Sequence, residues 1–298
     1  MNFKCGYVSI LGRPNVGKST LLNKLVGQKI SIVSPKPQTT RNVVTGILNQ
    51  PNMQVVFLDT PGIHKSKNSL DRYMEKSISK SLEGIDLILY MLDGTKRFFE
   101  EDIDDIKSLC AGKIPVVVLV SKIDSTTFEK LYPELSKLNL LENVKEIIPF
   151  SSFNGKNLDV IIKTIEGYMP ESPAMYPTDT VTDVSERFVA SEIIREKSLW
   201  LLQQEIPHGI AVEIEKFHQT KDVTKISATL YCEKDNHKKI IIGSQGSTLK
   251  KIGEESRKDL ERMLQTKVFL ELWVKVKEHW RDSDILVSNL GYDKKDLN

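Results

Sequence analysis

The chain has 298 residues, enough for about two domains, and its 42 Lys and Arg against 40 Asp and Glu give a net charge of +2. This balance excludes nucleic-acid binding by bulk charge alone, and 40% apolar residues exclude wholesale disorder. The longest apolar runs fall far short of the ~20 residues that span a bilayer. The first residues do not follow the secretory signal pattern, and the three scattered cysteines form no zinc motif. We therefore expect a cytoplasmic protein with reduced thiols.

The first half of the chain alternates short apolar runs with longer amphipathic segments. Apolar strands without polar alternation, separated by helices, predict a mostly parallel sheet with helices on both faces, an α/β domain. The predicted elements, in chain order, are strand 7–11, helix 19–26, strand 54–58, helix 70–81, strand 87–92, helix 99–109, strand 116–120, helix 127–138, strand 146–150 and helix 158–168.

Prolines at 170, 173 and 177 break any helix and stiffen an extended connection. We therefore predict a first domain over residues 1–170, a linker over 171–182 and a second domain over 183–298. The second half predicts helix 186–204, strands 210–217 and 224–231, helix 247–264 and strand 267–276, which together form a small α+β domain.

A glycine-rich motif, G-x-x-x-x-G-K-S, stands directly after the first predicted strand and opens a helix. Backbone N–H groups of such a loop converge on phosphate oxygens, the lysine reaches the terminal phosphates, and the serine hydroxyl ligates Mg²⁺. A chance glycine turn is the alternative, but the strand–helix context favours a P-loop. The predicted nucleotide-binding residues here are Gly12, Arg13, Pro14, Asn15, Val16, Gly17, Lys18, Ser19 and Thr20.

A second motif, Asp59-Thr60-Pro61-Gly62, follows the strand 54–58. Aspartate at that strand end can hold the magnesium ion, and the Gly62 amide can face the γ-phosphate. Pro-Gly is also a strong turn signal, but the upstream P-loop favours the functional interpretation. The next residue is Ile63, whose side chain cannot orient an attacking water, so we expect slow hydrolysis by the protein alone.

The base-recognition residues follow the strand 116–120, as Ser121, Lys122, Ile123 and Asp124. A carboxylate in the plane of guanine accepts two hydrogen bonds that adenine cannot offer, so Asp124 disfavours an ATP-using enzyme. The alternative is that Asp124 is an ordinary helix N-cap. After the next strand, the pair Ser151 and Ser152 would offer a backbone N–H to the guanine carbonyl.

This series of motifs resembles those of guanine-nucleotide-binding GTPases, and residues 36–41 resemble the first switch of the Era family of bacterial ribosome-assembly GTPases. The resemblance implies that Thr40 joins Ser19 and Asp59 as a magnesium ligand, and that Asn15 holds a potassium ion unless it is a simple turn residue. The implied switch residues are Gln38, Thr39, Thr40, Arg41 and Asn42.

Two positions depart from the family pattern, which usually has Asn at 121 and often Ala at 152. We expect Ser121 to lose the amide that ties the base loop to the phosphate loop, and guanine affinity to be weaker. Because Asp124 is unchanged, we expect the preference for guanine to survive.

A glycine loop marks the second half, where an apolar helical turn runs into Gly-Ser-Gln-Gly and a basic helix follows. Residues 234–258 hold seven basic residues against three acids. Side-chain-free glycines would let a sugar–phosphate backbone approach, although a surface loop is the alternative. The pattern resembles a type II KH domain, which follows the GTPase domain in that family. The implied RNA-binding residues are Ile242, Gly243, Ser244, Gln245, Gly246, Lys250 and Lys251.

The resemblance covers essentially the whole chain and implies a Mg²⁺-dependent GTPase that binds GTP and GDP. It also implies binding to the small ribosomal subunit, at its ribosomal RNA near the 3′ end, and a role in subunit maturation. We expect a monomer in the cytoplasm, with any contact to the inner membrane peripheral. The alternatives are an RNA-binding nucleotide switch, or a membrane-peripheral GTPase, whose hydrolysis is incidental.

Overall fold

The computed structural model describes residues 2–292, which form two compact units. Of these, the first unit contains residues 2–31, Thr40–His64 and Ser77–Asp183, and the second contains Ile32–Thr39, Lys65–Lys76 and residues 184–292. Within the described residues, no helix is both long and apolar enough to cross a membrane.

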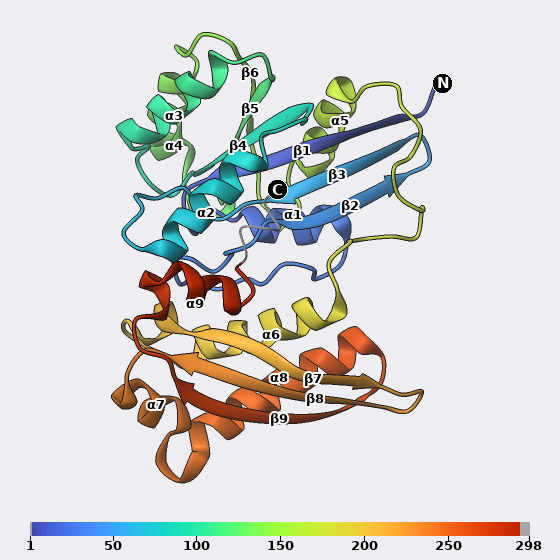
Figure 1. The fold of residues 1–298 in the computed structure, drawn as a ribbon. Coiled ribbons are helices and arrows are strands. Elements are labelled where there is room, and N and C mark those ends of the chain that lie inside the picture. Colours follow the sequence, from blue (N-terminus) through green and yellow to red (C-terminus); the bar gives the residue numbers. More distant parts are fainter. Residues whose placement is uncertain (1, 293–298) are drawn as a thin grey trace. The chain divides into compact units, whose positions relative to one another are not determined.

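The first unit is built on a six-stranded sheet of order β2-β3-β1-β4-β5-β6 (Figure 1). All neighbouring strands are parallel except β2 and β3, which pair antiparallel. The predicted α/β class with a mostly parallel sheet is therefore confirmed. The strands are β1 (Lys4–Gly12), β2 (Val44–Gln50), β3 (Met53–Asp59), β4 (Leu87–Asp93), β5 (Val116–Ser121) and β6 (Val144–Pro149).

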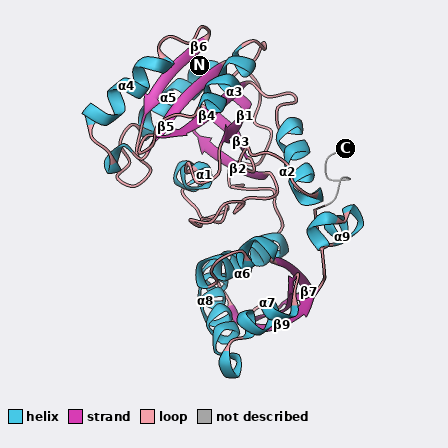
Figure 2. Ribbon diagram, turned by 90° about the vertical axis from the view of Figure 1, so that its left-hand side faces the viewer, coloured by secondary structure: helices cyan, strands magenta, loops and turns pink. Residues whose placement is uncertain are grey.

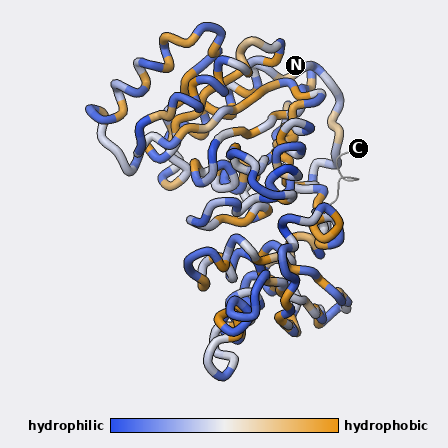
Figure 3. Tube along the Cα trace, turned by 60° about the vertical axis from the view of Figure 1, so that its left-hand side comes forward, coloured by the Kyte–Doolittle hydropathy of each residue, from blue (hydrophilic) through white to orange (hydrophobic). Residues whose placement is uncertain are grey.

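Every residue of the central strands β4 and β5 is buried. Because side chains alternate between the two faces of a strand, both faces of the sheet are covered. Figure 3 shows orange, hydrophobic segments gathered in the interior of this unit. Ile88 and Tyr90 pack against Ile106 and Leu131 of two helices on one face. The helices in this part of the chain are α1 (Lys18–Val26), α2 (Ser69–Lys80), α3 (Glu100–Cys110), α4 (Phe128–Leu138) and α5 (Leu158–Tyr168).

The edge strand β2 is absent from the elements predicted by the apolar pattern. Its sequence contains Gly46 and ends on the polar pair Asn49-Gln50, so it does not form an apolar run. It forms because the short turn at Pro51-Asn52 folds it back along β3. A Cβ on Gly46 would lie 2.5 Å from the Leu22 Cδ1 atom, so the absent side chain lets α1 pack closely against this strand.

The second unit contains a three-stranded sheet of order β7-β8-β9, with β9 at one edge. Figure 2 shows α6 and α8 on the same side of this sheet, and their apolar side chains share one core with the inner face of the strands. The predicted helix 186–204 ends earlier, at Leu201, because Leu202 has an extended backbone. The elements are α6 (Glu186–Leu201), β7 (Ala211–Gln219), β8 (Val223–Cys232), α7 (Asp235–Ile242), α8 (Ser247–Leu264), β9 (Lys267–Val276) and α9 (Asp284–Asn289).

The segments Ile32–Thr39 and Lys65–Lys76 group with this second unit, whereas the sequence-based division assigned both to the first domain. Helix α6 holds the segment Ile32–Thr39 through both backbone groups of Val33. The Glu196 carboxylate accepts from the Val33 N–H at 2.9 Å, and the Trp200 indole donates to the Val33 carbonyl at 3.0 Å. At the other end, Arg195 donates to the Thr39 carbonyl. These side chains lie far away in sequence, and hydropathy patterns do not report them.

Candidate functional site

The P-loop joins β1 to α1 with the backbone that the motif predicts. Gly12 has φ +137°, and a Cβ there would collide with the Met91 carbonyl oxygen, so only glycine fits. The Lys18 Nζ is buried and donates to the carbonyls of Gly12 at 2.9 Å and Arg13 at 3.1 Å. Burial lowers the pKa of Lys18 to about 8. This cation therefore gains from a nearby anion such as a phosphate.

Three side chains predicted to bind magnesium lie together. The Ser19 and Thr40 hydroxyl oxygens are 2.9 Å apart, and Ser19 donates to Asp59 Oδ2 at 2.6 Å. Ser31 donates to the same oxygen at 2.8 Å, a contact that the motifs do not predict. The other carboxylate oxygen, Oδ1, is buried and has no hydrogen-bond partner among the described residues. Since Mg²⁺ prefers oxygen ligands, this set fits that ion, and burial raises the pKa of Asp59.

The Asp59–Gly62 motif lies directly against the P-loop. A Cβ on Gly62 would lie 2.6 Å from the Pro14 nitrogen, and the Ile63 N–H donates to the Gly12 carbonyl at 3.1 Å. The Thr60 hydroxyl donates to the Ile10 carbonyl at 2.7 Å. The motif is therefore fixed beside the phosphate loop. The Ile63 side chain packs against the apolar core on one face of the sheet.

Asp124 lies exposed after β5, with both carboxylate oxygens oriented by hydroxyl groups. Ser151 donates to Oδ1, and Ser125 donates to Oδ2 at 2.8 Å. These hydrogen bonds, that from Ser151 above all, lower the pKa of Asp124. The N-cap of α4 is Thr127, so Asp124 does not cap that helix. Its exposed, ionised carboxylate is the geometry that guanine recognition requires.

Ser151 and Ser152 have different hydrogen-bond roles, which the motif does not predict. The Ser151 N–H donates to the Lys156 carbonyl at 3.1 Å, while its side chain holds Asp124. Among the described residues, no hydrogen bond engages the Ser152 N–H. Within this pair, Ser152 is therefore the residue able to donate to a guanine carbonyl.

The expected loss of the tie at Ser121 is wrong. Its buried hydroxyl lies 2.6 Å from the Val16 carbonyl oxygen of the P-loop and 3.0 Å from the Leu92 carbonyl oxygen of β4. A serine hydroxyl reaches these acceptors because β4 runs beside β5 and brings Leu92 close, and because the P-loop places Val16 beside the end of β5. Lys122 adds a second tie, since its Nζ donates to the Asn15 carbonyl and to Asp93, both at 2.7 Å.

Two further P-loop residues show how the loop is held. Asn15 has φ +65°, a left-handed backbone conformation that asparagine tolerates. The Arg13 guanidinium lies 5.3 Å from the centre of the Phe99 ring and donates to Asp102 at 2.8 Å. The buried Tyr90 hydroxyl donates to the same carboxylate at 3.1 Å. No motif predicts this network, because Phe99 and Asp102 belong to a different helix, at the start of α3.

The predicted switch residues are divided between the two units. Gln38 and Thr39 belong to the second unit, where the Gln38 amide donates to Asp71 at 2.8 Å. Thr40, Arg41 and Asn42 belong to the first unit, and Arg41 is buried. The division between the units thus falls immediately before the predicted magnesium ligand Thr40.

The glycine loop of the second unit connects α7 to α8. Gly243 and Gly246 have φ +76° and +80°, and a Cβ on Gly243 would collide with the Thr248 hydroxyl. Ser244 and Gln245 stand exposed between them. The backbone of the loop is therefore open to a large ligand.

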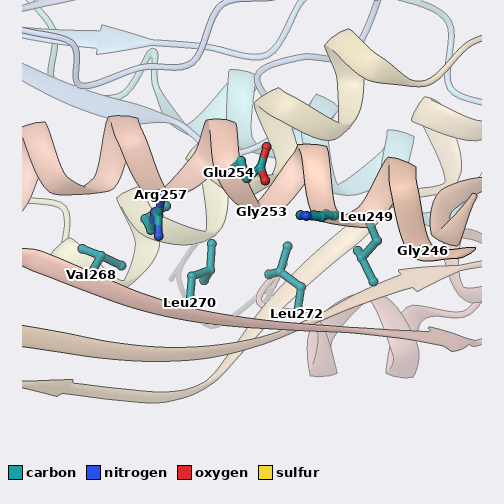
Figure 4. Close-up of a pocket in the computed structure, with 9 residues that line it drawn as sticks. Gly246, Leu249, Gly253, Glu254, Arg257, Val268, Leu270 and Leu272 are labelled. Atoms are coloured by element: carbon teal, nitrogen blue, oxygen red, sulfur yellow. The ribbon is translucent and has the colours of Figure 1, made fainter.

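A groove runs from this loop between α8 and β9 (Figure 4). Its volume is about 430 Å³, and leucines from both elements face one another across it. Of the predicted RNA-binding residues, Gly246 and Lys250 line the groove. The remaining predicted residues do not line it: Ile242, Gly243, Ser244, Gln245 and Lys251. The complete lining is Gly246, Leu249, Lys250, Gly253, Glu254, Arg257, Val268, Leu270 and Leu272.

Sequence reasoning missed most of this groove. The helical spacing of Leu249, Gly253 and Arg257, and the alternation of Leu270 and Leu272 along β9, could have identified the two walls. That the walls face each other depends on the packing of α8 on β9.

The fold and the site together define a P-loop GTPase followed by a KH domain. Two family models match accordingly: a 50S ribosome-binding GTPase over residues 7–122 and a KH domain over residues 205–281. The sequence is 49% identical to the GTPase Era of Clostridium botulinum (strain Eklund 17B / Type B) over 294 residues, covering 98% of this chain and 100% of that protein. It is 47% identical to the GTPase Era of Clostridioides difficile (strain 630), covering 98% and 100% of the two chains. The chain belongs to the Era family of GTPases.

Two solved structures are similar over nearly the full length. One is Era in complex with MgGDPNP and nucleotides 1506–1542 of 16S ribosomal RNA, with a TM-score of 0.94 and 40% identity, covering 97% of this chain and 99% of the other. The second is a variant of Aquifex aeolicus Era bound to GDP.AlF4-, with a TM-score of 0.93 and 41% identity, covering 97% and 99%. The predicted GTPase activity, the family and the KH domain are confirmed.

Proposed function

We propose that this GTPase binds 16S ribosomal RNA near its 3′ end through the groove between α8 and β9, and acts in maturation of the small ribosomal subunit. The observation that carries the proposal is the exposed glycine loop, which opens onto a groove with Lys250 and Arg257 on its wall. Backbone N–H groups and cations there suit a sugar–phosphate chain, and the leucine floor suits unstacked bases. The relative in complex with a 16S ribosomal RNA segment supports the choice of RNA.

For the hydrolysis reaction, we propose that Ser19, Thr40 and Asp59 hold Mg²⁺, which would neutralise charge on the phosphates. Lys18 and the P-loop N–H groups stabilise the charge that develops on the phosphate oxygens. Asp124 selects guanine, and Ile63 cannot orient water, so turnover without a partner is slow. We further propose that Asn15 holds a potassium ion that substitutes for an arginine finger.

The proposed ribosomal role leads us to infer that the protein acts in the cytoplasm as a monomer, with any membrane contact peripheral. A ribosomal RNA partner also explains why the chain combines a nucleotide site with a KH domain. An RNA-binding switch with incidental hydrolysis would differ, because RNA or small subunits would leave its turnover unchanged.

The test is RNA binding by a variant with Ser244→Asp and Gln245→Asp. Two carboxylates beside phosphates repel them at a cost of several kcal/mol, so binding to a 3′-terminal 16S ribosomal RNA fragment should be abolished. GTP affinity should be unchanged, because the loop lies in the other unit. The matched control is Ser244→Asn with Gln245→Asn, which places neutral side chains of the size of aspartate at the same positions and should keep RNA binding.

Two results would contradict the proposal. Normal RNA retention by the double variant would remove the glycine loop from the interface. Cross-linking of the wild-type protein in cells to scattered messages, instead of ribosomal RNA, would refute the ribosomal role.

A further inference from the structure

Two large aromatic side chains stand on the outer face of the sheet in the second unit. Phe269 and Trp273 on β9 are 55% and 60% exposed, although residues of this type usually gain by burial. They are four residues apart on one strand, so they share a face and their Cα atoms lie ~13 Å apart.

The opposite face of β9 contacts the groove and the core of the second unit. Its alternate residues, Leu270 and Leu272, line the RNA groove, while Val268 and Val274 are buried in the core. Strand β9 is also the edge of the sheet. A chain that leaves the groove past this strand therefore meets the outer aromatic face without crossing any other element of the sheet.

The charges on this outer face are arranged around the aromatics. Lys267 and Lys275 flank them at alternate positions of β9, and Lys225 pairs with Phe269 across the ladder to β8. Three acids share this face: Glu215 is paired with Lys275 at 3.1 Å, Tyr231 donates to Glu213 at 2.9 Å, and Ser227 donates to Glu271 at 2.9 Å. Lys267 and Lys225 at the Phe269 end suit phosphates, and at the other end the Lys277 Nζ lies 4.7 Å from the centre of the Tyr231 ring.

We propose that the outer face of β9, with Phe269 and Trp273 as stacking platforms, binds the single-stranded RNA that continues beyond the groove. This inference rests on the proposed function and extends it to a second RNA surface. Aromatic rings on a sheet stack bases without sequence preference, and lysines beside them contact the backbone. The groove selects the RNA, and the aromatic face adds affinity for its continuation.

A protein partner is the competing occupant of an exposed apolar face. Continuity with the groove and the flanking lysines favour RNA. The two differ in what they need from the side chain: a base needs a flat ring, whereas an apolar protein surface accepts any apolar side chain of similar size.

The experiment measures the affinity of the full chain for RNA of nucleotides 1506–1542 of 16S ribosomal RNA, the segment bound by the relative, and for nested fragments shortened from either end. The short probe is the smallest fragment whose binding is abolished by the Ser244→Asp, Gln245→Asp double variant. We expect Trp273→Leu and Phe269→Leu each to weaken binding of the longest RNA by about 10-fold. Both should bind the short probe like the wild type.

Conservative and control variants make the result specific. Trp273→Phe should retain most of the affinity, because it keeps a ring, and Phe128→Leu, an exposed aromatic on α4, should change nothing. The long RNA should also quench indole fluorescence in the wild type and not in Trp273→Phe.

Three results would overturn the inference. The first is a wild-type affinity that does not rise with fragment length. The second is wild-type binding of every RNA by the leucine variants, which would leave the face to a protein partner. The third is a wild-type protein that binds no fragment, which alone of the three also refutes the proposed function.

Discussion

We predict that removing the Ser121 hydroxyl weakens nucleotide binding by an amount that its hydrogen-bond geometry sets. It lies 2.6 Å from the Val16 carbonyl oxygen and 3.0 Å from the Leu92 carbonyl oxygen, in a side chain that is 3% exposed. Ser121→Ala removes the donor and leaves both buried acceptors without it. A hydroxyl has one hydrogen, so the loss corresponds to one shared hydrogen bond plus an unsatisfied acceptor, about 1–3 kcal/mol.

Part of that loss falls on the nucleotide, because Val16 belongs to the phosphate loop. If ~1–2 kcal/mol of it reaches binding, GDP and GTP should both bind about 5–30-fold more weakly. The preference for guanine over xanthine should not change, since Asp124 keeps its hydroxyl donors. The nucleotide-free protein should also unfold at a lower temperature.

The assay is equilibrium titration with a fluorescent GDP analogue, displaced by GTP or xanthosine triphosphate. Ser121→Thr keeps the hydroxyl and should restore affinity. Ser152→Ala is the matched control, because it removes a hydroxyl from the base loop and keeps the backbone N–H. Affinity within twofold of the wild type for Ser121→Ala, or a changed base preference, would show that the hydrogen bond from Ser121 to Val16 does not support nucleotide binding.

Three further predictions concern the same site. Asp124→Asn should weaken GTP binding strongly and improve binding of xanthosine triphosphate, measured by competition; unchanged GTP binding would remove Asp124 from base recognition. GDP affinity should fall as pH rises through about 8, the lowered pKa of Lys18, because phosphates bind the protonated amine. Above that pH, calorimetry should find proton uptake when the wild type binds GDP and none when Lys18→Met binds it. The same proton uptake in both proteins would show that another group takes up the proton. Turnover should be faster in potassium than in sodium, and Asn15→Gly, which keeps the left-handed backbone, should remove the difference; equal wild-type rates in both salts would contradict the potassium site.

Much of the nucleotide site could be predicted from sequence because its chemistry is local. The P-loop needs its glycines and Lys18 at fixed spacing beside a strand and a helix, and the apolar runs locate that strand and helix. The same holds for α8 and β9, whose predicted bounds, 247–264 and 267–276, agree with the structure. An apolar pattern indicates which face of a helix or strand is buried, and for these two elements that pattern was enough to predict where each begins and ends.

The tertiary structure decided which distant groups meet. Ser121 keeps its tie to the P-loop because the tertiary fold places Val16 of that loop and Leu92 of the neighbouring strand β4 within reach of a short side chain. The segment ending at Thr39 joins the second unit because α6 supplies partners more than 150 positions away. Such contacts depend on long-range packing, on which a sequence pattern carries no information.

The sequence by itself determined the family, the guanine nucleotide and the parallel-sheet domain, because motifs and apolar periodicity act over a few residues. Only the tertiary structure decided that strand β2 folds back as an edge and that Ser151 orients Asp124. It alone showed that the leucines of β9 face α8 across a groove. These features arise where helices and strands pack together. The packing energy depends on contacts between segments that lie far apart in the chain, so no short stretch of sequence encodes it.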